Sequence, residues 1–280
     1  MRVRPLGLLW YHHAVRILAA LIIATGLAAS AVEAADPLAE ARRLYNSGQF
    51  DAAEQAALEA LKAPAMSEGA RLVLGRIHLE RFRRSANPAE LAAGREALRA
   101  VDTRTLDPRD RVELTIGFGE ALYLEDRFGP AAELFAWVLD RSALLGPVAH
   151  ERLLDWWATA LERLAQGQPK EARHGIYRRI LDRMEEELAL EPGLGPAAYW
   201  LTAAARGLGD LERAWHVAAS SWVGAVLARD HGAALRADLD RLVVQAIIPE
   251  RAARLHVRDS KAAAAGMLAE WAAFKSNWTR

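Results

Sequence analysis

The chain has 280 residues, of which 52% are hydrophobic, and this content excludes a disordered protein. Lysine plus arginine and aspartate plus glutamate number 36 each, so no large field of one sign is present to attract nucleic acid or an anionic membrane. The lack of cysteine excludes disulfides, thiolate catalysis, cysteine metal sites and the attachment residue of a lipoprotein.

Residues 1–34 are predicted to be a secretory signal peptide. Arg2, Arg4 and Arg16 form a basic start, and residues 17–29 are an uncharged apolar stretch. Small residues suit cleavage after Ala31 or Ala34, and we favour Ala34. The alternative is an uncleaved membrane anchor, but the stretch is shorter than the roughly 20 residues that a spanning helix needs. We therefore expect a soluble protein of the periplasm or cell envelope.

The remaining sequence predicts helices separated by glycine and proline. Asp36, Asn87, Asp107 and Asp259 are capping residues in front of apolar runs with helical spacing. Glu90 follows Asn87 at the spacing of a capping box. No segment shows a convincing strand pattern, and the nearest candidate, at residues 243–248, continues the helical phase of the leucines before it. The fold class is therefore predicted to be all-α.

An internal period gives the architecture. Small residues recur in the first turns of successive helices, at separations of 40, 38, 41 and 42 residues: Ala53, Ala93, Ala131, Ala172 and Ala214. Apolar residues follow each of them four and eight positions later, which makes one apolar stripe per helix. A small residue followed by larger apolar residues is typical of closely paired helices, so the chain is predicted to consist of helix hairpins.

Two stretches resemble tetratricopeptide (TPR) repeats, and three further ones are weaker copies. The first carries Ala41, Leu44, Gly48, Phe50, Ala53, Ala57, Ala60, Leu61 and Pro64, and the second carries Gly119, Leu122, Asp126, Phe128, Ala131, Phe135 and Leu139. The resemblance implies a right-handed superhelix of about five irregular helix hairpins over residues 35–229. It also implies peptide or protein binding, since this family rarely catalyses reactions.

The last residues, 230–280, depart from the repeat and are predicted to be capping helices. Apolar residues at positions i, i+4, i+7 and i+11 define the final helix: Met267, Trp271, Phe274 and Trp278. Because a helical solenoid needs an end cap, we expect this helix to cover the core. The alternative is that these four residues dock a partner.

A binding groove is predicted from the adjacent pair Trp156 and Trp157. Neighbouring helix residues point about 100° apart, so both cannot face the same partner helix. By the geometry of the family, Trp156 packs inside the repeat and Trp157 faces the concave surface. The same face of the other repeats completes the predicted groove: Arg42, Tyr45, Asn46, Arg76, Glu80, Glu120 and Tyr123. It lacks the lysine and asparagine set of the carboxylate-clamp TPR domains.

No residues form a recognisable catalytic or metal-binding pattern. The histidines are too scattered to hold a metal from one helix face, and no nucleophile elbow or phosphate loop is present. The acidic residues 185–187 are interpreted as a solvated helix face. We therefore expect a non-catalytic binding protein without cofactor or metal, whose partner is a protein or peptide and not a nucleic acid. The alternatives are an accessory subunit that contacts glycan or peptidoglycan, and an enzyme with an unrecognised site.

Overall fold

The computed structural model describes residues 36–255 and 259–279, and these ranges contain helices and no strand. The predicted all-α fold class is thereby confirmed for this part of the chain. The predicted signal peptide and its alternative, a retained anchor, lie outside the described residues.

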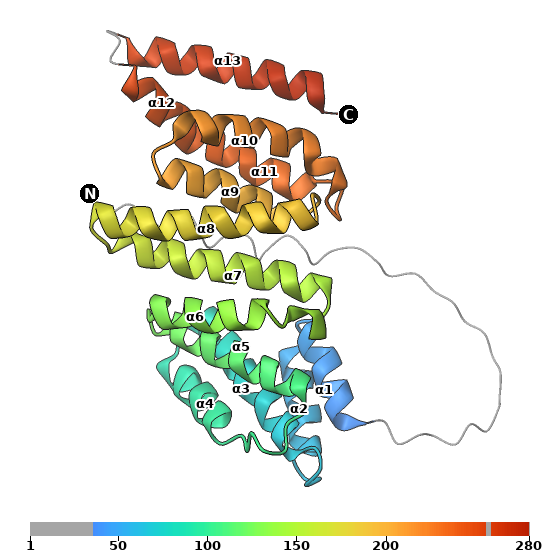
Figure 1. Cartoon of the computed structure of the whole chain (residues 1–280). Coiled ribbons are helices and arrows are strands. Elements are labelled where there is room, and N and C mark those ends of the chain that lie inside the picture. The colour runs from blue at the N-terminus through green and yellow to red at the C-terminus, as the bar shows by residue number, and fades with distance from the viewer. Residues whose placement is uncertain (1–35, 256–258, 280) are drawn as a thin grey trace, which may run out of the picture.

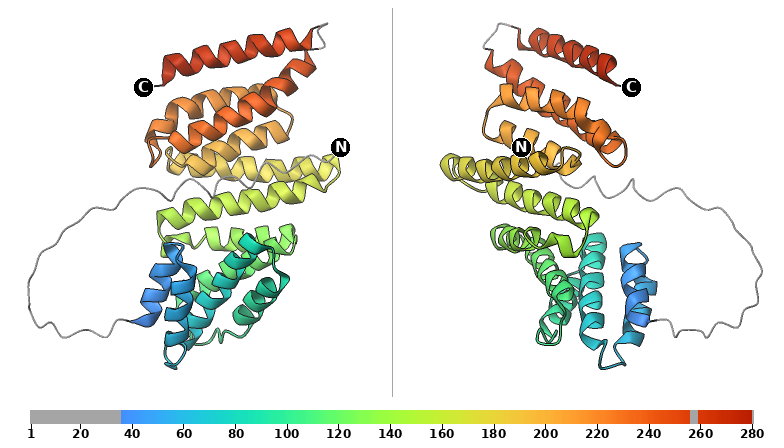
Figure 2. Two further views of the ribbon diagram at one scale, coloured as in Figure 1. Left: turned by 180° about the vertical axis from the view of Figure 1, so that it is seen from behind. Right: turned by 45° about the vertical axis from the view of Figure 1, so that its right-hand side comes forward.

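Consecutive helices pack against one another and stack from α1 at one end to α13 at the other (Figures 1 and 2). The first ten are α1 (Pro37–Asn46), α2 (Phe50–Ala60), α3 (Ser67–Ser85), α4 (Pro88–Arg99), α5 (Pro108–Leu124), α6 (Phe128–Leu139), α7 (Pro147–Gln166), α8 (Lys170–Leu190), α9 (Gly195–Gly207) and α10 (Leu211–Gly224). Helix α7 packs more extensively on α6 than on α8, and α8 packs more extensively on α9, so the predicted division into five hairpins is not distinct in this part of the stack.

The chain ends with α11 (Ala233–Leu242), α12 (Ile248–Arg254) and α13 (Ser260–Trp278). A π-helical turn, Val243–Ile247, joins α11 to α12, so the nearest candidate for a strand is helical. Two short 3₁₀ turns, Ser142–Leu144 and Ala225–Leu227, lie in the connectors before α7 and α11.

The predicted capping residues are confirmed. Side-chain oxygens of Asp36, Asn87, Asp107 and Asp259 accept hydrogen bonds from backbone N–H groups in the first turns of α1, α4, α5 and α13. Glu90 differs from the expectation of a capping box, because its carboxylate lies 2.7 Å from His78 Nδ1 of α3. Glu90 therefore connects α4 with α3 and does not complete a capping box at the start of α4.

The small contact residues are confirmed at three of the five repeats. Ala53, Ala131 and Ala214 are completely buried between helices. Ala93 is only partly buried, and Ala172 is exposed, so the expectation for the Ala172 repeat is wrong. The buried positions of α8 begin only at Tyr177, so the first turn of this long helix projects beyond the core.

The last helix covers the end of the core through Trp271. Its ring is 1% exposed and packs edge-on against Trp215 and Trp222 of α10, with centroids 5.6 and 5.5 Å away. Its indole N–H donates to Asp240 Oδ1 at 2.8 Å. Trp271 is therefore a core residue, and the alternative that it docks a partner is wrong. Trp278, at the end of α13, is exposed.

Candidate functional site

The odd-numbered helices line up charged and aromatic side chains along one continuous face, which we call the odd-helix face. Its members are Tyr45, Arg76, Glu80, Arg83, Glu120, Tyr123, Asp155, Trp156, Tyr199, Trp200 and Asp238. Direct contacts join Tyr45 to Arg76, Arg76 to Glu120, Arg83 to Trp156 and Trp200 to Asp155. These contacts run across α1, α3, α5, α7 and α9, and Asp238 of α11 is near enough for its charge to act on Tyr199.

At the first end of the face, four of the residues predicted for the groove lie together. Arg42, Tyr45 and Asn46 of α1 and Arg76 of α3 border one small cavity of about 20 Å³, together with residues of α5. The Arg76 guanidinium carbon lies 4.8 Å from the centre of the Tyr45 ring, and Arg42 forms a 2.5 Å ion pair with Asp110. The Nε atoms of both arginines are buried without a hydrogen-bond partner. These four residues therefore lie together, and their role in binding stays a prediction.

Glu80 and Glu120, predicted to line an open polar groove, are instead buried charges. Glu120 is 0% exposed and neither of its carboxylate oxygens accepts a hydrogen bond, although Arg76 Nε lies 3.5 Å away and Arg83 Nη2 lies 3.9 Å away. Arg83 also forms a 2.7 Å pair with Glu80. Burial raises the pKa of the Glu80 carboxyl, and Arg83 opposes this shift. The close packing of α3 on α5 covers both carboxylates, which local sequence patterns do not show.

Aromatic residues continue the face over α7 and α9. The Arg83 guanidinium lies 5.4 Å from the centre of the Trp156 ring, which connects α3 with α7. The Trp200 indole N–H donates to Asp155 Oδ1 at 2.9 Å and so connects α9 with α7. Burial raises the pKa of Asp155, and this hydrogen bond opposes the shift. A carboxylate is thus held in a poorly solvated position among aromatic rings.

Asp238 of α11 ends the face. Burial raises its pKa to about 6, although Arg241 lies 2.7 Å away and favours the charged form. Burial also raises the pKa of the neighbouring Tyr199 hydroxyl to about 12, and the charge of Asp238 adds to that shift. The second end of the face is therefore acidic and sensitive to pH.

The raised pKa of Asp238 predicts that part of the stability is lost as pH increases. The ordinary pKa is 3.8, so between pH 4 and pH 6 the folded state binds more protons than the unfolded state. Stability from this group is greatest below pH 4 and declines as pH rises through about 6. We expect Asp238→Asn to remove a difference on the order of 2 kcal/mol between pH 4 and pH 7. Urea unfolding of both proteins across this range measures it, and equal slopes would contradict the assignment.

The structure reverses the predicted roles of Trp156 and Trp157. Trp157 is 3% exposed and belongs to the main core, whereas Trp156 is only partly buried and lies on the odd-helix face beside Phe135. The expectation that Trp157 faces the groove is wrong. Adjacent residues had to point in different directions, but the rotation of α7 between α6 and α8 decides which residue points inward.

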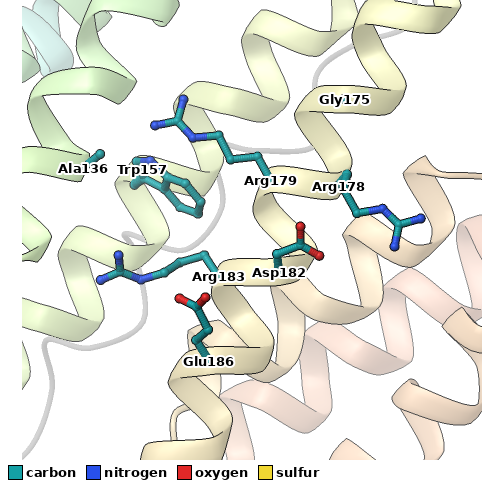
Figure 3. Close-up of a pocket in the computed structure, with 8 residues that line it drawn as sticks. All are labelled: Ala136, Trp157, Gly175, Arg178, Arg179, Asp182, Arg183 and Glu186. Carbon is teal, nitrogen blue, oxygen red and sulfur yellow. The ribbon is translucent and has the colours of Figure 1, made fainter.

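Trp157 instead forms the floor of a hollow of about 450 Å³ between α6 and α8 (Figure 3). Arg179 and Arg183 stand on either side of the ring and pair with Glu133 and Asp140 of α6, at 2.5 and 3.3 Å. The Trp157 indole N–H is buried without a partner. Because carboxylates already neutralise both arginines, we assign no ligand to this hollow.

A Ser–His–Glu chain connects the α6–α7 connector with α8. Ser142 Oγ lies 2.7 Å from His150 Nδ1, and His150 Nε2 lies 2.8 Å from Glu187 Oε2. Glu187 is buried and also accepts from Arg183, so the prediction of a fully solvated acidic face is wrong at this position. Ser142 is buried too, and its hydroxyl is within hydrogen-bond distance of the Leu139 carbonyl. This hydroxyl is closed to a substrate, so we interpret the chain as a structural connection.

Other site types find little support in the described part of the chain. Within residues 36–255 and 259–279, no three histidine, cysteine or acidic side chains come together in a way that could hold a metal ion. Across the same residues, no helix is both long and apolar enough to cross a membrane.

The fold defines this chain, over the residues that the structure describes, as an all-α protein of stacked helices. It matches no known family model, no curated protein and no solved structure.

Proposed function

We propose that this protein is a non-catalytic scaffold of the bacterial periplasm or cell envelope that binds a protein or peptide along the odd-helix face. In this proposal the helix hairpins form a TPR-like superhelix and the odd-helix face is its concave side. The observation that carries the proposal is the continuity of the face, because six successive odd-numbered helices contribute charged or aromatic residues to it.

The dimensions and chemistry of the face favour a macromolecular partner. The cavity described on it holds about 20 Å³, whereas pockets for small ligands usually measure 300–1,000 Å³. A peptide would instead follow the face over several helices and meet its partly exposed members, among them Tyr45, Tyr123 and Trp156. Arginine and aromatic side chains are also the residues that most often dominate protein interfaces.

The two alternatives have less support. A glycan-contacting surface requires aromatic rings exposed in a row, but on the odd-helix face Trp200 is buried and Trp156 is partly covered. A hydrolytic enzyme requires an accessible nucleophile, and Ser142 is buried beside the Leu139 carbonyl. We therefore place both behind protein binding.

Photo-crosslinking in the native cell envelope tests the proposal. Asn46 is exposed beside Tyr45 on α1, and Gln55 is exposed on α2, which is outside the odd-helix face. A photoreactive residue at position 46 should give a discrete crosslinked polypeptide, while the same residue at position 55 should not. Equal products from both positions, or none from position 46, would contradict binding along this face.

A further inference from the structure

Exposed apolar side chains concentrate on one side of the helix stack, which we call the apolar edge. It consists of Trp137, Leu144, Val148, Leu190, Val226 and Leu227. These are six of the ten large hydrophobic residues that are exposed in the described residues, and their exposed fractions range from 41% to 84%. Large exposed apolar groups usually mark an interaction surface when they occur together.

Three connectors that are distant in sequence bring these residues together. Figures 1 and 2 show that the α6–α7, α8–α9 and α10–α11 connectors lie on the same side of the stack. Arg229, two residues after Leu227, forms a 2.6 Å ion pair with Glu151 of α7. A Cβ atom added to Gly193 would lie 2.6 Å from the Leu227 carbonyl oxygen, so the α8–α9 connector lies directly against Leu227. The connectors that carry the edge therefore adjoin one another.

The charged groups around the edge are mostly in local contacts. Arg141 lies over the Trp137 ring, with its guanidinium carbon 4.0 Å from the ring centre, and donates to the Trp137 carbonyl at 2.9 Å. Asp230 accepts from the backbone of Gly232 and Ala234, and Glu151 is paired with Arg229. Arg152 and Glu191 complete the set, and both are exposed. Acidic and basic groups therefore nearly balance.

We propose that the apolar edge inserts into the surface of a lipid bilayer. Its apolar residues are separate tips on turns and helix ends, and both hollows described above lie elsewhere. A bilayer adapts to separated tips, whereas a protein partner needs a matched and closely packed surface. Trp137 lies under the Arg141 guanidinium, and tryptophan and arginine side chains are both typical of the headgroup region of a bilayer. Because the acidic and basic groups around the edge nearly balance, insertion of its apolar side chains supplies the binding, and attraction to charged lipid headgroups does not.

The sequence before α1 supports a lipid surface as the occupant. Residues 17–29 are apolar and follow three arginines, and the signal peptide predicted from them would bring this chain to a membrane during export. The inference does not rest on the proposed function, because the apolar edge and the odd-helix face share no residue. A scaffold bound to a membrane by this edge would keep Tyr45, Asn46 and Trp156 available to a partner.

Vesicle flotation tests the proposal with protein isolated from the cell envelope, carrying whatever N-terminus it has there. The probes are phosphatidylcholine vesicles with and without phosphatidylglycerol. The edge variant is Leu190→Asp with Leu227→Asp, and the matched control is Leu58→Asp with Leu268→Asp, which changes two exposed leucines elsewhere. We expect the edge variant to reduce the bound fraction at least about tenfold on both vesicle types, because two apolar insertions are lost, and the control to bind like the wild type.

A local fluorescence measurement makes the test independent of the N-terminal segment. Lipids brominated on their acyl chains should quench part of the tryptophan emission of the wild type, and this part should be missing in Trp137→Phe. Quenching that is unchanged by Trp137→Phe would overturn the proposal. Equal losses of vesicle binding in the edge and control variants would also overturn it. The same holds for vesicle binding that requires phosphatidylglycerol and is unchanged in the edge variant. Self-association that the edge variant abolishes, without vesicle binding, would assign the edge to a second copy of this chain.

Discussion

Replacing Trp157 with alanine is expected to lower the free energy of unfolding by about 3–5 kcal/mol, because the change removes a buried ring and leaves a cavity that the surrounding helices fill only in part. The Trp157 ring is 3% exposed and lies between α6 and α8. Trp157→Phe should cost much less, since it keeps most of the packing and removes an N–H that has no hydrogen-bond partner. Chemical unfolding followed by circular dichroism measures both changes.

Trp156→Ala is the matched control, since the neighbouring residue carries the same side chain on the same helix. Trp156 is only partly buried, and its contacts are Phe135, at a centroid distance of 5.9 Å, and the Arg83 guanidinium. We expect it to cost roughly 1–2 kcal/mol, less than Trp157→Ala. A larger loss from Trp156→Ala than from Trp157→Ala would show that α7 is rotated the other way.

Replacing Arg76 with alanine is expected to cost about 3–5 kcal/mol, because it leaves the carboxylate of Glu120 buried with weaker compensation. Glu120 is completely buried, and after the change the nearest remaining cation is Arg83, at 3.9 Å. The variant also loses the guanidinium that lies over the Tyr45 ring. Chemical unfolding at neutral pH gives the loss.

The control for Arg76→Ala removes both charges together. Arg76→Met combined with Glu120→Leu replaces the pair by apolar side chains of similar length, and such replacements of buried ion pairs are often neutral or stabilising. We therefore expect the double variant to be clearly more stable than Arg76→Ala alone. An Arg76→Ala protein that unfolds like the wild type would contradict this prediction. It would mean that the pair of Arg76 and Glu120 contributes little to the free energy of unfolding.

These two predictions concern places where the sequence alone was insufficient. Two adjacent tryptophans must point in different directions on a helix, and that much follows from local geometry. Which of them enters the core depends on how α7 is rotated between its neighbours, and residues distant in sequence set that rotation. The prediction of a polar groove was wrong at Glu80 and Glu120 for a related reason, because the packing of α3 on α5 determines whether these side chains are buried.

The sequence by itself determined the local features. Helix starts at Asp36, Asn87, Asp107 and Asp259 depend on a side chain and a backbone N–H only a few residues away, so local pattern was enough to predict them. The hairpin period was also readable, since small residues such as Ala53 and Ala131 recur where helices come close. Only the tertiary structure decided which charged residues are buried, and only it brought Leu190 and Leu227 to one edge. Those outcomes depend on contacts between distant segments, whose geometry no local periodicity records.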